Sequence, residues 1–338
     1  MVRKMKLNFS FAILLLCMLT FNANSQQINE THQVGIKCGT NLNTDTFAYK
    51  EDGVWKGYDA DICRAFSWAL YGNGDMFDMV DVKTYEIEKA LTSGKIDIML
   101  SNNASMASME AKNKASSVAL LYYDRQMFAT KDAPENISSM NDFKGKKVCV
   151  FAGSDYLDNL RQYNKKYKLD FHIMVFKSLR KARNAFLLKR CDLITYQGLQ
   201  LQQIISDSPG KNLQILPEEF AFFPVYAYVS PYNNALRIVA KWVFNSLYAA
   251  EDMGLNKENA AEFYYKDNQM NQNLFGDDDM LWKYLKVQPS WLRSAIADVG
   301  NMGEIFERNL GSQSEFKLKR GKASLLKDGG TVTVEDFK

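Results

Sequence analysis

Polar side chains follow three segments of the chain that are predicted to be buried strands. The segments SNNAS at 101–105, AGSD at 152–155 and TYQG at 195–198 each come directly after an apolar run. Ligands of open parallel sheets bind outside the carboxyl ends of the strands. The chemistry expected there is hydrogen bonding to a small polar solute, and the side chains and backbone groups expected to provide it are those of Asn103, Ser105, Gly153, Ser154, Tyr196 and Gln197.

The turn Gly153-Ser154-Asp155 precedes a predicted helix at 155–167. The first turn of a helix has free backbone N–H groups and a partial positive charge, which suit a carboxylate. Ser154 would add a hydroxyl. The alternative is an ordinary helix cap, which needs no ligand.

Groups for catalysis or for metal binding are few. The sequence has no Ser/His/Asp or Cys/His constellation, no Gly-rich phosphate loop and no nucleotide motif. Its two histidines, His32 and His172, and its cysteine spacing do not resemble a zinc site. The sequence therefore predicts a protein that is not an enzyme and that binds no metal and no cofactor.

The N-terminal 25 residues are typical of a secretory signal peptide. Three basic residues precede the apolar run FAILLLCML, and Ala23-Asn24-Ser25 provides a small-residue exit. Its cleavage would place the mature chain in the periplasm and reduce the net charge from +3 to about zero, which disfavours nucleic acid as a partner. A lipid anchor on Cys17 is the alternative.

Four cysteines remain after the leader: Cys38, Cys63, Cys149 and Cys191. An even number in an oxidising compartment suggests two disulfides, although spacing alone leaves three pairings open. Four buried free thiols are the alternative.

Hydrophobic periodicity predicts two similar βαβαβ units. Strands are expected at 33–40, 78–85 and 95–101, then at 144–151, 171–177 and 191–197, with helices at 59–72, 85–94, 155–167 and 178–190 between them. Such alternation implies mostly parallel sheets. Extended aromatic-rich segments near 126–132 and 221–231 would be hinge strands, so the fold class is α/β with two lobes. We expect one lobe to consist of 33–127 with 228–338, including a helix at 233–254 and a C-terminal extension, and the other of 128–227.

Several segments in order resemble a known family. GVWKGYDADICRA, LTSGKIDIMLSNN, GKKVCVFAGS, LLKRCDLITYQG and VGNMGEIFERNLG are similar to extracellular solute-binding proteins of family 3, in particular the general L-amino-acid binders. The resemblance implies a type II-like periplasmic-binding-protein fold, a monomer that carries an amino acid or similar small solute to a membrane ABC permease. It also implies the disulfides Cys38–Cys63 and Cys149–Cys191, and places Phe47 against the ligand side chain, or else as a loop aromatic that seals the lobe.

The chain departs from this family where the amino acid would be held. NASMASME places Ala107 and Glu110 where relatives have the threonine and arginine of T-x-x-R, so the guanidinium that binds the α-carboxylate is missing. Tyr196 and Gln197 replace the aspartate that binds the α-ammonium. Arg125 stands where relatives have a small residue, and is either a relocated carboxylate clamp or a solvated surface arginine.

These departures leave several hypotheses open. The solute is atypical, with Glu110 as a contact to a cationic group. Alternatively Glu110 and Arg125 pair and close the site, or the scaffold has become a sensor or interaction protein. A dehydratase-like enzyme with Glu110 as general acid or base is a further alternative.

Overall fold

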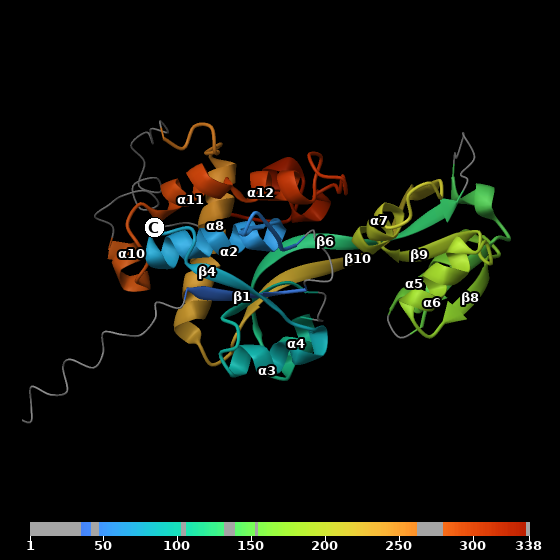
Figure 1. Cartoon of the computed structure of the whole chain (residues 1–338), viewed down its shortest axis with the longest axis horizontal. Helices are drawn as coiled ribbons and strands as arrows, with labels where there is room; N and C mark the ends of the chain where they lie inside the picture. The colour runs from blue at the N-terminus through green and yellow to red at the C-terminus, as the bar shows by residue number, and fades with distance from the viewer. Residues whose placement is uncertain are drawn as a thin grey trace, which may run out of the picture. The chain divides into compact units, whose positions relative to one another are not determined.

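The predicted alternation of strands and helices is present in the protein (Figure 1). The computed structural model describes residues 35–41, 47–102, 106–131, 139–152, 155–261 and 280–335. The predicted signal peptide at 1–25 lies outside them. Among the described residues, no helix combines the length and the apolar character needed to cross a bilayer.

The first βαβαβ unit has the predicted order of elements, but the strand expected at 78–85 ends at Asp81, and Thr84–Glu86 form a 3-10 helix. Its elements are β1 (Ile36–Thr40), α2 (Tyr58–Tyr71), β4 (Phe77–Asp81), α3 (Ile87–Thr92) and β5 (Ile98–Asn102). A hairpin of β2 (Tyr49–Glu51) and β3 (Val54–Lys56) precedes α2, and the short helix α4 (Met106–Ala111) follows β5. β1 pairs in parallel with β4 and β5.

The second unit repeats the pattern. Its elements are β7 (Lys147–Phe151), α5 (Tyr156–Tyr167), β8 (His172–Phe176), α6 (Leu179–Leu187), β9 (Leu193–Gln197) and α7 (Gly198–Ser206). β7 pairs in parallel with β8 and β9. One face of these strands packs on α5 and the other on α6 and α7.

Two long strands connect the units. β6 (Ser116–Lys131) and β10 (Leu213–Val229) pair antiparallel along most of their length. On its other edge β10 pairs antiparallel with β5, and β6 pairs antiparallel with β9. The sheet order is therefore β4-β1-β5-β10-β6-β9-β7-β8. The segments predicted as hinges overlap the C-terminal parts of these strands, and both strands begin earlier in the sequence than the aromatic-rich patterns indicated.

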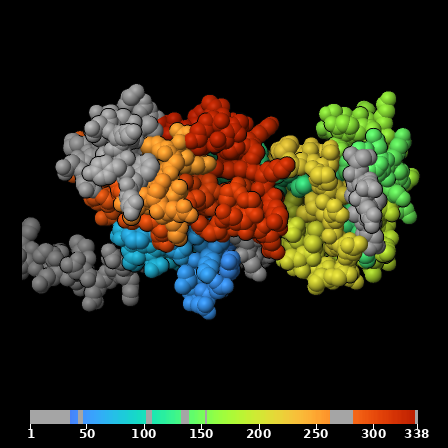
Figure 2. All heavy atoms as spheres, turned by 90° about the horizontal axis from the view of Figure 1, so that it is seen from above, coloured from blue at the N-terminus to red at the C-terminus, as the bar shows by residue number. Residues whose placement is uncertain are grey.

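The C-terminal third returns to the first unit. The helices α8 (Asn234–Asp252), α10 (Met280–Leu285), α11 (Trp291–Val299) and α12 (Met302–Asn309) share a hydrophobic core with α2, and α3 and α4 contribute to a separate core. C-terminal residues, coloured orange to red, form the middle of the face seen in Figure 2. Helices of the C-terminal third thus pack against the first unit.

Both disulfides have the pairing that the resemblance implied. Cys38 of β1 is bonded to Cys63 of α2, and Cys149 of β7 to Cys191, just before β9. The Cα–Cα distances are 6.2 and 5.7 Å, within the usual range for a disulfide. Each bond joins two elements of the same unit.

Gly39 in β1 lets β1 pack closely on the segment before β5. A Cβ there would lie 2.5 Å from Cδ1 of Ile96 and 2.8 Å from Sδ of Met99, two fully buried side chains. Because these side chains cannot move into solvent, Gly39→Ala should lower the free energy of unfolding by about 1–3 kcal/mol. Urea unfolding of both proteins would measure it, and an unchanged midpoint would contradict the tight packing.

Candidate functional site

The first part of the site is a buried carboxyl at the start of α2. Asp59 is fully buried and accepts hydrogen bonds from Thr40 Oγ1, at 2.5 Å, and from Ser101 Oγ. Thr40 and Ser101 stand at the carboxyl ends of β1 and β5. Burial raises the pKa of Asp59 to about 7, while the two hydroxyl bonds act in the opposite direction.

Tyr122 of β6 lies beside this carboxyl. Its ring stacks on Phe47 with a centroid distance of 6.2 Å and meets Tyr58 edge to face at 5.8 Å. Burial raises the pKa of the Tyr122 phenol well above its usual value, and the carboxylates of Asp124 and Asp59 raise it further. Tyr122 is therefore within electrostatic reach of two buried carboxyls.

Asp124 is the second buried carboxyl and is 3% exposed. It accepts the backbone N–H of Arg125 at 2.7 Å, and those of Gly198 and Leu199 at the start of α7. Gln197, the residue before α7, provides no side-chain cap, so Asp124 of the hinge strand supplies it. Burial raises the pKa of Asp124 to about 7, against these bonds and the Arg125 charge.

Phe47, Asp59, Tyr122 and Asp124 form a cluster of buried side chains. Two tyrosines extend this cluster into the second unit. Tyr156, at the start of α5, contacts Tyr196 at the end of β9 with ring centroids 4.6 Å apart, and Phe223 of β10 at 5.3 Å. Burial raises the pKa of both phenols, and the Asp124 carboxylate adds to the effect in each. The cluster thus runs along β6 and involves strand ends of both units.

Amide side chains lie against the same end of α5. Gln126 donates to the Tyr156 carbonyl at 3.0 Å and to Thr195 Oγ1 at 3.2 Å, and accepts from Asn159 Nδ2 at 3.2 Å. Gln197 pairs directly with Gln126 across β9 and β6, which places both side chains on one face. Nε2 of Gln197 is buried and has no partner among the described residues.

Arg125 is not the solvated surface arginine that the sequence allowed. It is 5% exposed and forms an ion pair with Glu219 of β10 at 2.9 Å, so it is neither solvated nor paired with Glu110. Consecutive residues of a strand point to opposite faces, so Arg125 and Gln126 diverge. Arg125 lies near Gly321, where an added Cβ would be 3.4 Å from its Nη2.

Glu110 is held at the far end of β6. Its exposed carboxylate accepts the Ser117 backbone N–H at 3.0 Å and the Ser117 hydroxyl. Ser117 precedes Tyr122 by five residues on an extended strand, a distance of about 16 Å. The structure therefore does not bring Glu110 to the cluster.

The structure gathers some of the predicted residues and adds others. Phe47, Tyr196 and Gln197 belong to the cluster, whereas Asn103, Ser105, Gly153 and Ser154 lie outside the described residues. The sequence reasoning missed four members: Asp59, Tyr122, Asp124 and Tyr156. The available signal was acidic residues within apolar or aromatic surroundings, in GYDAD and YYDRQ.

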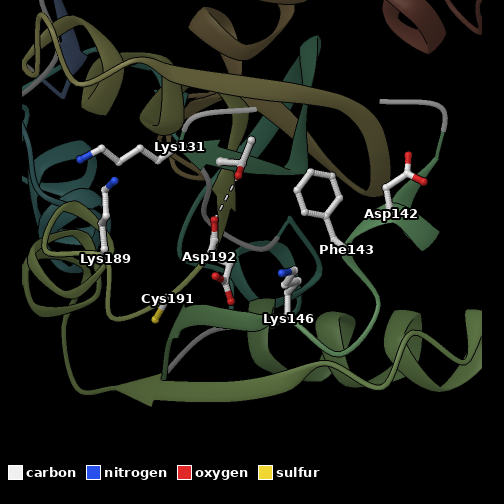
Figure 3. Close-up of a pocket in the computed structure, with 8 residues that line it drawn as sticks. Lys131, Asp142, Phe143, Lys146, Lys189, Cys191 and Asp192 are labelled. Atoms are coloured by element: carbon white, nitrogen blue, oxygen red, sulfur yellow. Dashed lines mark hydrogen bonds between the residues drawn. The ribbon is translucent and has the colours of Figure 1, made fainter. Parts of the chain in front are cut away.

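A pocket of about 360 Å³ lies at the other end of the second unit (Figure 3). Lys131 and Lys189 both line it, and Thr130 Oγ1 donates to the Asp192 carbonyl at 3.1 Å. Asp192 directly precedes β9, so this pocket is at the amino ends of the parallel strands. None of the predicted ligand residues lines it.

A metal centre is not part of the described site. Among residues whose placement is described, no group of three or more His, Cys, Asp or Glu side chains could hold a metal ion. The chemistry that the cluster offers is hydrogen bonding, aromatic contact and two titratable carboxyls.

Comparison with known proteins identifies one family. The sequence profile of the bacterial extracellular solute-binding proteins, family 3, matches residues 36–326. The chain is 29% identical over 300 residues to the general L-amino acid-binding periplasmic protein AapJ of Rhizobium johnstonii, which covers 87% of each chain. It is 26% identical over 304 residues to the glutamate/glutamine/aspartate/asparagine-binding protein BztA of Rhodobacter capsulatus, covering 89% of this chain and 90% of that one.

A solved structure is similar over nearly the whole chain. It is an ABC transporter periplasmic binding protein from Brucella ovis with glutathione bound. The two have a TM-score of 0.75 and 28% sequence identity, with 90% of this chain and 97% of that chain covered. The fold is thus that of two-lobed periplasmic binding proteins.

Proposed function

The chain belongs to the bacterial extracellular solute-binding proteins of family 3, and from that premise we propose that it is the periplasmic binding component of an ABC uptake system. Its cargo would be an amino acid or a small solute built from amino acids. It would deliver this cargo as a monomer to a membrane permease, after cleavage of residues 1–25.

The observation that carries the proposal is the amide of Gln197. Nearly all buried polar atoms in proteins have a hydrogen-bond partner, so an exception calls for an explanation. Gln197 is the last residue of β9 and pairs with Gln126, whose side chain reaches the start of α5, at the strand ends where a family ligand would bind. A ligand oxygen there would supply the missing acceptor.

The charges of the cluster fit a ligand with an ammonium group. Asp59 and Asp124 are two buried carboxyls, and neither has a charged group among the hydrogen-bond donors identified for it. The ligand carboxylate would bind the backbone N–H groups at the start of α5, which follows Gly153 and Ser154. The relatives named for L-amino acids and the neighbour solved with glutathione have ligands with both groups.

Binding would proceed by hinge closure. We propose lobes of 33–127 with 228–338 and of 128–227, connected by β6 and β10. The residues around Asp59 and the residues around Tyr156 would each contribute half of the contacts to the ligand. Since only the closed state makes both sets, the ligand shifts the population toward closure.

A ligand panel tests the function directly. Mature protein is mixed with each common amino acid and with glutathione, and thermal unfolding is followed. A solute at 100 times its dissociation constant should stabilise the fold by about 2.7 kcal/mol. Recovery of the solute unchanged would separate binding from turnover. No response to any of these solutes, or to a periplasmic extract, would contradict the proposal.

Gln197→Leu should weaken solute binding without lowering the free energy of unfolding. Removing a buried donor that has no partner among the described residues should leave the free energy of unfolding unchanged or higher. Solute affinity should fall about tenfold, because one hydrogen bond of about 1 kcal/mol or more is lost. Calorimetric titration measures the affinity. Gln203→Leu is the matched control, since Gln203 Nε2 donates to Asp207 Oδ1 at 2.8 Å on the exposed side of α7.

A further inference from the structure

A second pocket lies beside α2, outside the cluster along β6. Its volume is about 670 Å³, within the range of roughly 300–1,000 Å³ that small-molecule sites occupy. Its walls come from the β2–β3 hairpin, the outer side of α2 and the segment from the end of α11 through α12. Segments far apart in the sequence therefore converge on one hollow.

The pocket is separate from the cluster of the proposed function. Asp59 and Asp61 are two residues apart on α2, so their side chains point about 200° apart around the helix. Asp59 bonds to Thr40 and Ser101 at the strand ends, whereas Asp61 faces α12. A solute in this pocket would not contact the site along β6.

Asp61, Asp75 and Asp298 are the acidic residues among the described lining of the pocket, and Asp61 and Asp298 are already bonded. Asp61 is 8% exposed and accepts from Arg308 Nη2 at 2.6 Å and from Asn309 Nδ2 at 2.8 Å. Oδ2 of Asp298 accepts from the Trp68 indole at 2.8 Å. Both carboxylates thus have donors within the protein.

The guanidinium groups retain donor capacity. Arg64 is 9% exposed and makes one short bond, from Nη2 to the Trp55 carbonyl at 2.9 Å. Its contacts to Asp61 at 3.5 Å and to Asp298 at 3.9 Å are longer than good N–H···O bonds. Arg308 makes both of its identified bonds, to Asp61 and to the Val299 carbonyl, through Nη2. A planar fork with free N–H groups suits a carboxylate.

Two indoles provide apolar surface beside these cations. Trp55 and Trp68 both line the pocket and are half-buried. Gly74 lies against Trp68, where a Cβ would be 2.6 Å from Nε1 of the indole and 2.7 Å from Oδ2 of Asp298. The indole of Trp68 is therefore held by its bond to Asp298 and packs in part on the core, while the residue also lines the pocket.

We propose that this pocket is a second solute site, which binds a small carboxylate with an apolar or aromatic body. The carboxylate contacts the guanidinium groups of Arg64 and Arg308, and the body lies against the Trp55 and Trp68 rings. Lys257, which also lines the pocket, adds positive charge at its edge, whereas Lys56 is paired with Glu51. The site does not depend on which solute the cluster along β6 carries.

Fluorine NMR of the mature protein labelled with fluorotryptophan tests the site. Benzoate and butyrate are the carboxylate probes, and benzyl alcohol and benzylamine are the neutral and cationic matches of benzoate. Trp→Phe variants assign the resonances. At millimolar carboxylate, the Trp55 and Trp68 resonances should shift saturably, while those of Trp242, Trp282 and Trp291 should not.

Variants of Arg308 test whether its guanidinium binds the carboxylate. Arg308→Gln should weaken benzoate binding about tenfold, Arg308→Lys should weaken it less, and Arg237→Gln on exposed α8 should leave it unchanged. Benzylamine and benzyl alcohol should give no saturable shift. The proposal is overturned if neither carboxylate shifts Trp55 or Trp68, if the alcohol or amine acts as well as benzoate, or if both Arg308 variants bind like the unmodified protein. Because the amino-acid panel is read separately, either proposal can fail alone.

Discussion

Loss of either disulfide should destabilise the protein by several kcal/mol. The bonds close loops of 25 residues (Cys38–Cys63) and 42 residues (Cys149–Cys191). Loop-closure entropy in the unfolded chain then predicts a contribution of about 3.5 kcal/mol for the first bond and about 4 kcal/mol for the second. Urea unfolding of the two double Cys→Ser variants would measure these values.

The four-serine variant tests whether the bonds act independently. Each bond joins elements of one unit, β1 with α2 or β7 with the start of β9, so the two losses should add within about 0.5 kcal/mol. Reducing agent should have no effect on that variant but should destabilise the unmodified protein. A stable unmodified protein under reduction would show that the bonds contribute little.

The regular elements could be predicted because their signals are local. The helix at 85–94 was expected to stop at Gly94, and α3 ends at Thr92 with Gly94 at a φ of +70°. The strand at 191–197 has apolar residues that enter two cores on its two faces, as a parallel strand requires. Periodicity carries this information within the segment itself.

Helix α7 was missed for a reason that lies outside its own sequence. GLQLQQIIS has no N-cap side chain before it, and the capping carboxylate comes from Asp124 of β6. The lengths of β6 and β10 likewise depend on pairing with each other, which includes Pro224 opposite Tyr123. Local pattern cannot show a partner from another part of the chain.

The site was predictable only as a location. Strand ends indicated Tyr196 and Gln197, but sequence could not show that Asp59 and Asp124 are buried, since acidic residues are ordinarily exposed. One of the sequence-based hypotheses paired Glu110 with Arg125. In the structure Glu110 bonds to Ser117, and Arg125 pairs with Glu219. Which charges face one another is decided by tertiary packing.

The two buried carboxyls should make the free energy of unfolding fall as pH rises from about 4 to about 7. Their pKa values are about 7 in the folded protein, against an ordinary value near 3.8, because burial disfavours the charged form. A carboxyl whose folded pKa is raised binds its proton more tightly in the folded state. Below pH 4 both states are protonated; between pH 4 and 7 the unfolded state loses its proton first, so the free energy of unfolding decreases by up to about 4 kcal/mol per group.

Asparagine variants isolate this effect from the rest of the titration. Asp124→Asn and Asp59→Asn cannot ionise, so the stability of each relative to the unmodified protein should increase between pH 4 and 7 and level off above. Asp158→Asn removes an exposed carboxylate that pairs with Arg161 on α5, and controls for the loss of one negative charge. Urea unfolding at a series of pH values gives the differences, and parallel curves for Asp124→Asn and Asp158→Asn would show that Asp124 ionises as freely as a surface group. A cationic solute bound beside Tyr122 would lower the pKa values of both carboxyls. Saturating ligand should therefore shift the decrease in stability to lower pH. The charge state of these carboxyls is thus connected to the occupancy of the site.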